Sequence, residues 1–383
     1  MFESIQNLQL TSWKIRVKLV VTSLIIHNLE RLLRLQFIPR RWVIHLDSFS
    51  QRDMDREQED LQFLGFFGIF TESFNIVFSW RKIFSKITLT LILPLSLVFL
   101  AHIQVTELLF FKILKNEDSL NSIPKNSPKY TKLSDIITSE WISFWLFKAA
   151  YFTFFLVLAL LSTAAVVYTV ACVYTGKEIT FRKVISVVPK VWRRLMVTFV
   201  WNFVIVLVYN VVFGVLILLW AAIFGFGGVG VLFFAGVSVS YVLGFVYISV
   251  VWHLASVVSV LEDVYGIQAM LKSKELIKGK MVLSCAVFLT FTVLFLGSQL
   301  VFQTLVVLGS SKYNGLRIVL GILCFLLLFK VFLFGLVAQT IIYFVCKSYH
   351  HQNIDKSSLS DHLEVYLGDY VPLKAQDVQL GEL

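Results

Sequence analysis

The chain has 383 residues, of which 57% are hydrophobic and only 15% are charged, and it contains 36 phenylalanines. Soluble globular domains hold about 45–50% apolar and about 25% charged residues, so this composition excludes an ordinary water-soluble fold of that size. The net charge of +10 does not indicate nucleic-acid binding, because the cations cluster beside apolar stretches and not on one basic face. The composition predicts an all-α integral membrane protein.

The chain begins with a basic extension, residues 1–53, which precedes the first membrane-associated element. It carries an aliphatic stripe at helical spacing, but no small-residue cleavage site follows, so it is not typical of a signal peptide. Two interpretations stay open for this segment. It is either a helix that lies on the membrane or a transit-like extension upstream of the main domain, residues 54–346.

An amphipathic pattern follows, in which an aromatic stripe faces small and polar residues on the opposite side. A helix divided in this way is expected to lie flat in the headgroup layer. This segment begins at Gly68, similar segments begin at Gly176 and Gly266, and a basic cluster follows each of the three. We therefore expect three degenerate repeats of interfacial helix plus transmembrane hairpin, although cytosolic connectors tend to be basic in any case. The stripe consists of Phe63, Phe66, Phe67, Phe70, Phe74 and Val77.

Six stretches are apolar over the ~20 residues that a helix needs to cross a bilayer. They predict a six-helix transmembrane bundle, with amphipathic interfacial helices between the hairpins. The third and fourth stretches are separated only by a glycine-rich link. The predicted spans are residues 87–111, 149–174, 195–224, 231–261, 281–308 and 318–346.

The distribution of Lys and Arg predicts the orientation of the spans. The segment before the first span, two short connectors and the tail together hold 25 of the 34 Lys and Arg residues, whereas the three connectors on the other side hold 8. Cytosolic loops are enriched in these residues, so both termini are predicted to be cytosolic. The expected location is an endomembrane or the plasma membrane. The Ser-, Asn- and Pro-rich residues 112–148 are expected to form a lumenal or extracellular loop.

No cofactor, metal or catalytic motif is predicted. Gly225, Gly227 and Gly230 match the dinucleotide-binding glycine pattern, but they lie between two spans, and no acidic residue follows before Glu262. The four cysteines show no metal-ligand spacing. Gly236, Ser240 and Gly244 recur every four residues, which favours close packing of two helices and not a ligand site. We expect a protein that is not an enzyme.

Polar side chains inside the predicted spans are the candidate functional residues. Lys330 stands near the middle of the last span, where a cation is costly and is by default a functional hypothesis. Alternatively, Lys330 is structural, through snorkelling or a hydrogen bond to Gln339. The possible partners of Lys330 in a transport pathway are Gln299, Gln303, His253 and Glu107.

The tail, residues 347–383, carries six acidic and three basic residues and is predicted to be a mobile cytosolic segment that can dock protein partners. The basic connectors are predicted to contact anionic lipid headgroups.

The stretch from 261 to 280 resembles a segment of bacterial membrane proteins akin to the membrane domain of glycerophosphodiester phosphodiesterases. Residues 60–86 and 366–373 resemble a plant family of multi-pass proteins of unassigned function. The resemblance implies a multi-pass helical fold, and it implies no hydrolysis, because the chain lacks a phosphodiesterase domain. The matching residues of the first stretch are Glu262, Gly266, Ala269, Ser273, Leu276 and Gly279.

Two functions remain open from the sequence. The favoured one is a non-enzymatic membrane scaffold or adaptor that binds lipids or partner proteins. The alternative is a small-solute or ion transporter or channel that uses Lys330 and the polar residues near it.

Overall fold

The computed structural model describes residues 61–124, 127–175, 179–224, 228–309 and 314–350, and every regular element in these ranges is a helix. The predictions for residues 1–53 and for the tail lie outside the described residues, except at residues 347–350. In chain order the elements are α4 (Phe66–Ser79), α5 (Arg81–Ile87), the π-helix η1 (Thr88–Ile92), α6 (Leu93–Asn121), α7 (Pro128–Thr175), α8 (Phe181–Phe224), α9 (Gly228–Leu261), α10 (Ile267–Leu276), α11 (Met281–Val301), the π-helix η2 (Phe302–Val307) and α12 (Asn314–Tyr349).

Six helical stretches are long and apolar enough to cross a membrane, which confirms the predicted number. Several of them extend beyond the predicted bounds, because helix continues into polar sequence at their ends. The first stretch joins α5, η1 and α6 into one continuous rod. The six stretches are Arg81–Asn121, Pro128–Thr175, Phe181–Ile223, Phe233–Leu261, Met281–Val307 and Gly315–Tyr349.

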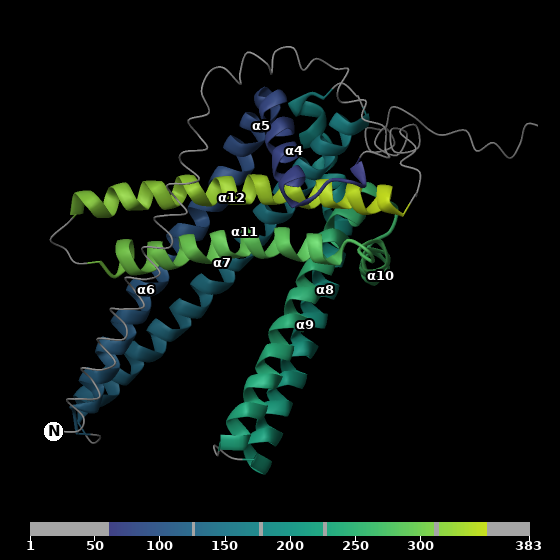
Figure 1. The fold of residues 1–383 in the computed structure, drawn as a ribbon. Helices are drawn as coiled ribbons and strands as arrows, with labels where there is room; N and C mark the ends of the chain where they lie inside the picture. The colour runs from purple at the N-terminus through teal and green to yellow at the C-terminus, as the bar shows by residue number, and fades with distance from the viewer. Residues whose placement is uncertain (1–60, 125–126, 176–178, 225–227, 310–313, 351–383) are drawn as a thin grey trace, which may run out of the picture.

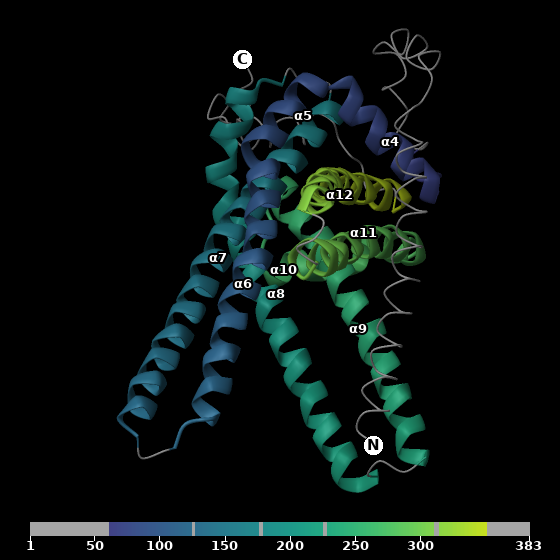
Figure 2. The ribbon, with the colours of Figure 1, turned by 90° about the vertical axis from the view of Figure 1, so that its left-hand side faces the viewer.

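The six stretches form three antiparallel hairpins, α6–α7, α8–α9 and α11–α12, which diverge from a common region (Figures 1 and 2). In both views α11 and α12 lie across the direction of the other two hairpins, and α4 and α5 lie at the end where the hairpins meet. The predicted six helices are therefore present, but one hairpin is oriented across the other two.

The main hydrophobic core lies where the hairpins converge. It is built from the last turns of α7, α9 and α12, the first turns of α8, and one face each of α4, α5 and α10. Small side chains such as Ala164, Ala165 and Ala255 are fully buried there, which lets the helices approach closely. A second, smaller cluster joins α6 to η2 and α12 through Phe99, Phe302 and other apolar side chains.

The outer parts of α8 and α9 contribute little to this core. In the most apolar stretch of α7, 67% of the residues are buried. In the corresponding stretches of α8 and α9, only 6% and 11% of the residues are buried. A helix that exposes apolar side chains around most of its circumference is stable in lipid and not in water. Among the described helices, these two therefore present the most extensive lipid-compatible surface.

Most of residues 112–148 is helical, which corrects the loop expected there. α6 continues to Asn121 and α7 begins at Pro128. The two extensions are joined by polar contacts: Asn116 donates to Glu140 at 2.8 Å, and the Trp141 indole donates to Glu117 at 3.2 Å. Ile113, Ile137 and Phe144 are buried between the extensions. Ser-, Asn- and charge-rich sequence thus forms helix here because the neighbouring helix satisfies its polar groups.

The three segments that were predicted to be interfacial differ from one another in structure. α10 begins directly after Gly266, as expected, whereas α4 begins after Gly65 and contains Gly68, the start expected from the sequence. The second segment has no separate helix, because α8 runs unbroken from Phe181 through the basic cluster and into the apolar stretch, with Pro189 inside it.

Candidate functional site

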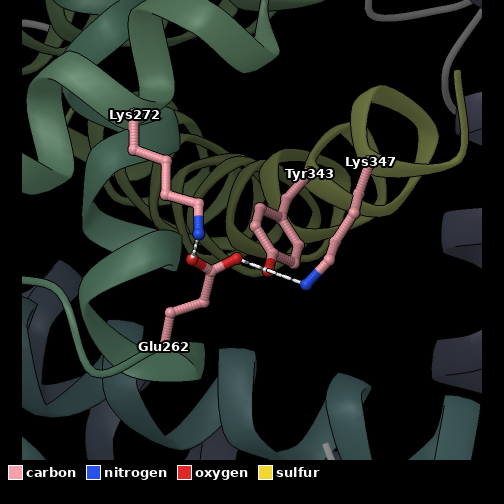
Figure 3. A network of polar contacts seen from close by, with 4 residues as sticks. All are labelled: Glu262, Lys272, Tyr343 and Lys347. Atoms are coloured by element: carbon pink, nitrogen blue, oxygen red, sulfur yellow. Dashed lines mark hydrogen bonds and ion pairs between the residues drawn. The ribbon is translucent and has the colours of Figure 1, made fainter. Parts of the chain in front are cut away.

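The most connected polar group described in the protein is the carboxylate of Glu262, one residue beyond the end of α9 (Figure 3). The Tyr343 hydroxyl donates to Glu262 Oε1 at 2.5 Å, and Lys347 Nζ lies 3.3 Å from the same oxygen. Lys272 Nζ forms an ion pair with the other oxygen, Oε2. Tyr343 and Lys347 come from α12 and Lys272 from α10, so one carboxylate links the ends of three helices. We call these four residues the Glu262 junction.

The Glu262 side chain is only 11% exposed, so its ionisation depends on these partners. Burial alone favours the neutral carboxyl and would raise its pKa. The hydrogen bonds from Lys272 and Tyr343, with the positive charges of Lys347 and Lys272, outweigh burial and hold the pKa of Glu262 below the ordinary value of a glutamate. The junction therefore holds a carboxylate and not a carboxylic acid at neutral pH.

Gly266 positions the connector between α9 and α10. Its φ is +67°, a conformation that glycine adopts at low cost. Its backbone N–H donates to Thr198 Oγ1 of α8 at 2.8 Å, and a Cβ at this position would lie 3.1 Å from the ring of Trp201. The Thr198 hydroxyl also pairs with Ser259 of α9 at 2.7 Å. A glycine is required here because the connector turns against the surface of α8.

The buried face of α10 holds the next three residues of the motif. Ala269 and Leu276 are buried, and the Ser273 hydroxyl donates to the carbonyl of Val251 in α9 at 2.7 Å. This hydrogen bond satisfies a buried hydroxyl and fixes α10 along α9. Together these side chains hold Lys272, on the neighbouring face, within reach of Glu262.

Gly279 ends the motif between α10 and α11. Its φ is +87°, and a Cβ at this position would collide with the ring of Tyr349 at the end of α12. The next residue, Lys280, donates to the carbonyl of Gln62 at 2.8 Å and lies 5.1 Å from the centre of the Tyr349 ring. The connector thus contacts both the end of α12 and the segment that precedes α4.

Both oxygens of the Glu262 carboxylate are paired within the protein. Oε1 accepts from Tyr343 and lies beside Lys347, and Oε2 forms the ion pair with Lys272. An ion pair outside this cluster, Arg194 with Asp263 at 2.8 Å, is more exposed. Within the described ranges, no group of three or more His, Cys, Asp or Glu residues is placed to hold a metal ion.

The intramembrane candidates from the sequence do not gather at one place. Gln303, in η2, donates to Glu107 of α6 at 2.5 Å. His253 pairs with Gln339 at 2.9 Å, so Gln339 is not the hydrogen-bond partner of Lys330 that one form of the structural interpretation offered.

Lys330 lies nine residues, or about 14 Å along α12, from Gln339. Neither the Lys330 side chain nor the Gln299 side chain makes a hydrogen bond or ion pair with any residue the structure describes.

The small residues of α9 are only partly packed. A Cβ at Gly244 would collide with the Tyr209 hydroxyl of α8, which agrees with close packing. At Gly236, by contrast, a Cβ would meet nothing within 4 Å. Gly236 and Ser240 line a groove of about 630 Å³ between α8 and α9, so the packing prediction is wrong at this end of the stripe.

The sequence motif identified Glu262 but not its partners on α12. Glu262 was singled out by its motif, but Tyr343 and Lys347 lie 81 and 85 residues away in the chain. The available signal was weak: a tyrosine and a lysine four residues apart, at the basic end of the last span, share one helix face.

These features define a class of protein: all-helical within the described ranges, with six helices able to cross a membrane and a polar junction at their converging ends. A family model described as Domain of unknown function (DUF8558) matches residues 54–383, and the chain belongs to this family. The searches of curated proteins and of solved structures returned no match. The matched region includes the whole Glu262 junction.

Proposed function

We propose that the protein is a non-enzymatic membrane scaffold whose converging, basic end lies on the cytosolic side and binds the anionic lipid surface there. In this proposal the two termini are cytosolic, and the acidic tail, residues 347–383, holds protein partners. The observation that carries the proposal is a row of exposed phenylalanines on a helix that is otherwise fixed to the core.

One face of α4 packs on the protein. Ile69, Ser73 and Ile76 are buried, and the Phe70 ring stacks on Phe291 of α11 at 5.4 Å between ring centres. The contacts of α4 with α12 are more extensive than those with α11. α4 is therefore held in a fixed orientation by the hairpin α11–α12.

Another face of α4 carries exposed side chains, and one more exposed ring precedes the helix. We call Phe63, Phe67, Phe74 and Phe78 the aromatic row; Phe67, Phe74 and Phe78 lie along one side of α4 at spacings of seven and four residues, and Phe63 lies three residues before the helix begins. Phe67 is 81% exposed and Phe63 is 79% exposed. Rings exposed in this way are unfavourable in water, but they suit the boundary between headgroups and acyl chains.

Exposed cations follow the aromatic row directly. Arg81, Lys82 and Lys86 of α5 are exposed and come within nine residues of Phe78. Each basic residue near an anionic leaflet contributes about 1 kcal/mol of attraction. Aromatic side chains followed by cations are the combination expected of a helix that lies on an anionic membrane surface.

The test measures how deeply the aromatic row enters the lipid. A spin label at Phe67→Cys is compared with one at Ser79→Cys, an exposed position on another face of α4, in the full chain reconstituted in nanodiscs. We expect the Phe67 label to lie about 5–10 Å into the boundary, where oxygen reaches it better than a water-soluble nickel chelate does. The Ser79 label should show the opposite preference. Equal access of the nickel chelate to both labels would overturn the proposal.

A further inference from the structure

A second polar contact lies within the apolar part of the hairpin α6–α7. Lys148 Nζ of α7 lies 2.9 Å from His102 Nε2 of α6. The sequence placed Lys148 at the end of an extramembrane loop, but it lies inside a continuous helix, with its ammonium 5.4 Å from the centre of the Phe144 ring. A lysine and a histidine thus make the polar contact that joins the two helices at this level.

The contact has a defined donor if Lys148 keeps its charge. A charged ammonium group has three donors and no acceptor, so in that state Lys148 donates to His102 Nε2. That nitrogen then carries no proton, and the imidazole is neutral with its proton on Nδ1. His102 Nδ1 is buried and has no hydrogen-bond partner among the described residues. A second proton on the ring would have to enter at Nε2, the atom that Lys148 occupies.

The surroundings of His102 offer limited compensation for a positive ring. From α7, the ring of Tyr151 stacks on the imidazole at 3.6 Å between ring centres. On α6 the nearest acid along the chain is Glu107, five residues away, and its Oε1 accepts from Gln303 of η2. η2 itself presents no titratable group. The titratable or charged groups on the part of α12 that packs toward α6 and η2 are Cys324, Lys330 and Arg317, the last of which donates to the carbonyl of Val306.

We propose that His102 and Lys148 form an acid-sensitive latch between α6 and α7. At neutral pH the latch is closed by the hydrogen bond from the ammonium to the imidazole. In acid, a proton from water adds to Nε2, the hydrogen bond from Lys148 is lost, and two cations face each other at contact distance. Like charges this close in an apolar environment repel strongly, so the helices separate locally.

The experiment measures the separation of the helices directly. Spin labels are placed at Ala101→Cys and Ala150→Cys, exposed positions beside the two latch residues, in the full chain in nanodiscs with the four native cysteines replaced by alanine. Pulsed electron resonance then gives the distance between labels at about pH 7.5 and about pH 3, because a partly buried ring beside an ammonium takes up a proton only in stronger acid than a free imidazole does. We expect a longer and broader distance distribution in acid.

Two variants isolate the latch from other titrating groups. His102→Gln keeps an acceptor for Lys148 but takes up no proton, and Lys148→Met removes the second cation, so both should give the same distance at the two pH values. An unchanged distance in the wild type, or the same acid response in His102→Gln, would overturn the proposal. Nitrogen-15 spectra of the labelled histidines provide a second readout that does not depend on opening. At neutral pH they must show His102 as the neutral ring protonated on Nδ1, and a ring protonated on both nitrogens would equally overturn it.

Discussion

Glu262 carries the electrostatic connection between α9, α10 and α12. Replacing it with glutamine keeps the size of the side chain but leaves Lys272 and Lys347 without a carboxylate. Because hydrogen bonds to charged, mostly buried groups contribute about 1.5–3 kcal/mol, we expect Glu262→Gln to lower the free energy of unfolding by about 2–3 kcal/mol. Reversible unfolding by SDS in mixed micelles measures this loss.

Asp263→Asn is the matched control, one residue further along the chain. The Asp263 side chain is 72% exposed in its pair with Arg194, and exposed pairs contribute about 0–1 kcal/mol. Equal losses in the two variants would contradict a special role for Glu262.

The same carboxylate predicts a dependence of stability on pH. The pKa of Glu262 is lowered in the folded protein, because the donors and charges around it outweigh its burial. Its contribution is therefore fully present above the pKa of the unfolded chain and is lost as the pH falls through the folded value. The difference in stability between wild type and Glu262→Gln should stay constant above about pH 4.5 and shrink below it. A difference that grows in acid would contradict the assigned direction.

The glycines of the motif predict a contrast with glycines elsewhere. Gly266→Ala forces a side chain into a positive φ and against Trp201, and we expect a loss of about 1–3 kcal/mol in unfolding free energy. At Gly214, inside α8, an added methyl group would meet nothing within 4 Å, so Gly214→Ala should be neutral or stabilising by up to about 1 kcal/mol. The same SDS titration compares the two variants. A larger loss for Gly214→Ala would show that the turn at Gly266 is not strained by a side chain.

At the residue scale, sequence reasoning located half of each important contact. Glu262 and Gly266 belong to one local segment, whose residue types indicate a helix end and a turn. The partners Tyr343 and Lys347 could not be assigned, because an apolar helix of 36 residues gives no information on which neighbour it meets. The pairing of His253 with Gln339 was missed for the same reason, and Gln339 was instead considered as a hydrogen-bond partner of Lys330.

At the scale of elements, the helical extensions of α6 and α7 make the clearest prediction. If residues 112–121 and 128–148 form a helical hairpin, their backbone amides are hydrogen-bonded and should exchange slowly with deuterated solvent. Hydrogen-exchange mass spectrometry on the reconstituted chain tests this. Exchange at the rate of an unstructured peptide throughout these residues would contradict the helical hairpin and support the loop predicted from the sequence.

A matched variant tests what holds this hairpin together. Asn116 and Lys112 both contact Glu140, so Glu140→Ala removes two contacts from the hairpin at once. It should accelerate exchange in the extensions, while α10 stays protected.

Hydropathy predicted which residues form the apolar spans but not where the helices end, and both results have the same physical reason. A run of ~20 apolar residues identifies a helix that can cross lipid, but it says nothing about polar sequence beyond the bilayer. The Ser- and Asn-rich residues after Phe111 looked like a loop, yet contacts such as Trp141 with Glu117 stabilise them as helix. The break between α4 and α5 at Trp80 and the unbroken course of α8 were equally invisible to periodicity.

At the scale of the whole molecule, the core is concentrated at one end. The helices α7, α9 and α12 bury their last turns together there, whereas the hairpins diverge at the other end (Figure 2). The number of crossing helices could be predicted, because it depends only on local composition. The crossing of α11–α12 over the other hairpins could not, because it depends on contacts between distant segments.

The central claim is that the converging end and the tip of the hairpin α6–α7 lie on opposite sides of a membrane. A membrane-impermeant maleimide, applied to intact cells that express single-cysteine variants, tests this most directly. Lys274→Cys, in α10, and Ser122→Cys, at the tip of α6–α7, are both exposed positions. We predict that Ser122→Cys is labelled in intact cells or sealed lumen-out vesicles, and Lys274→Cys only after permeabilisation. Labelling of both positions from the same side would contradict this topology.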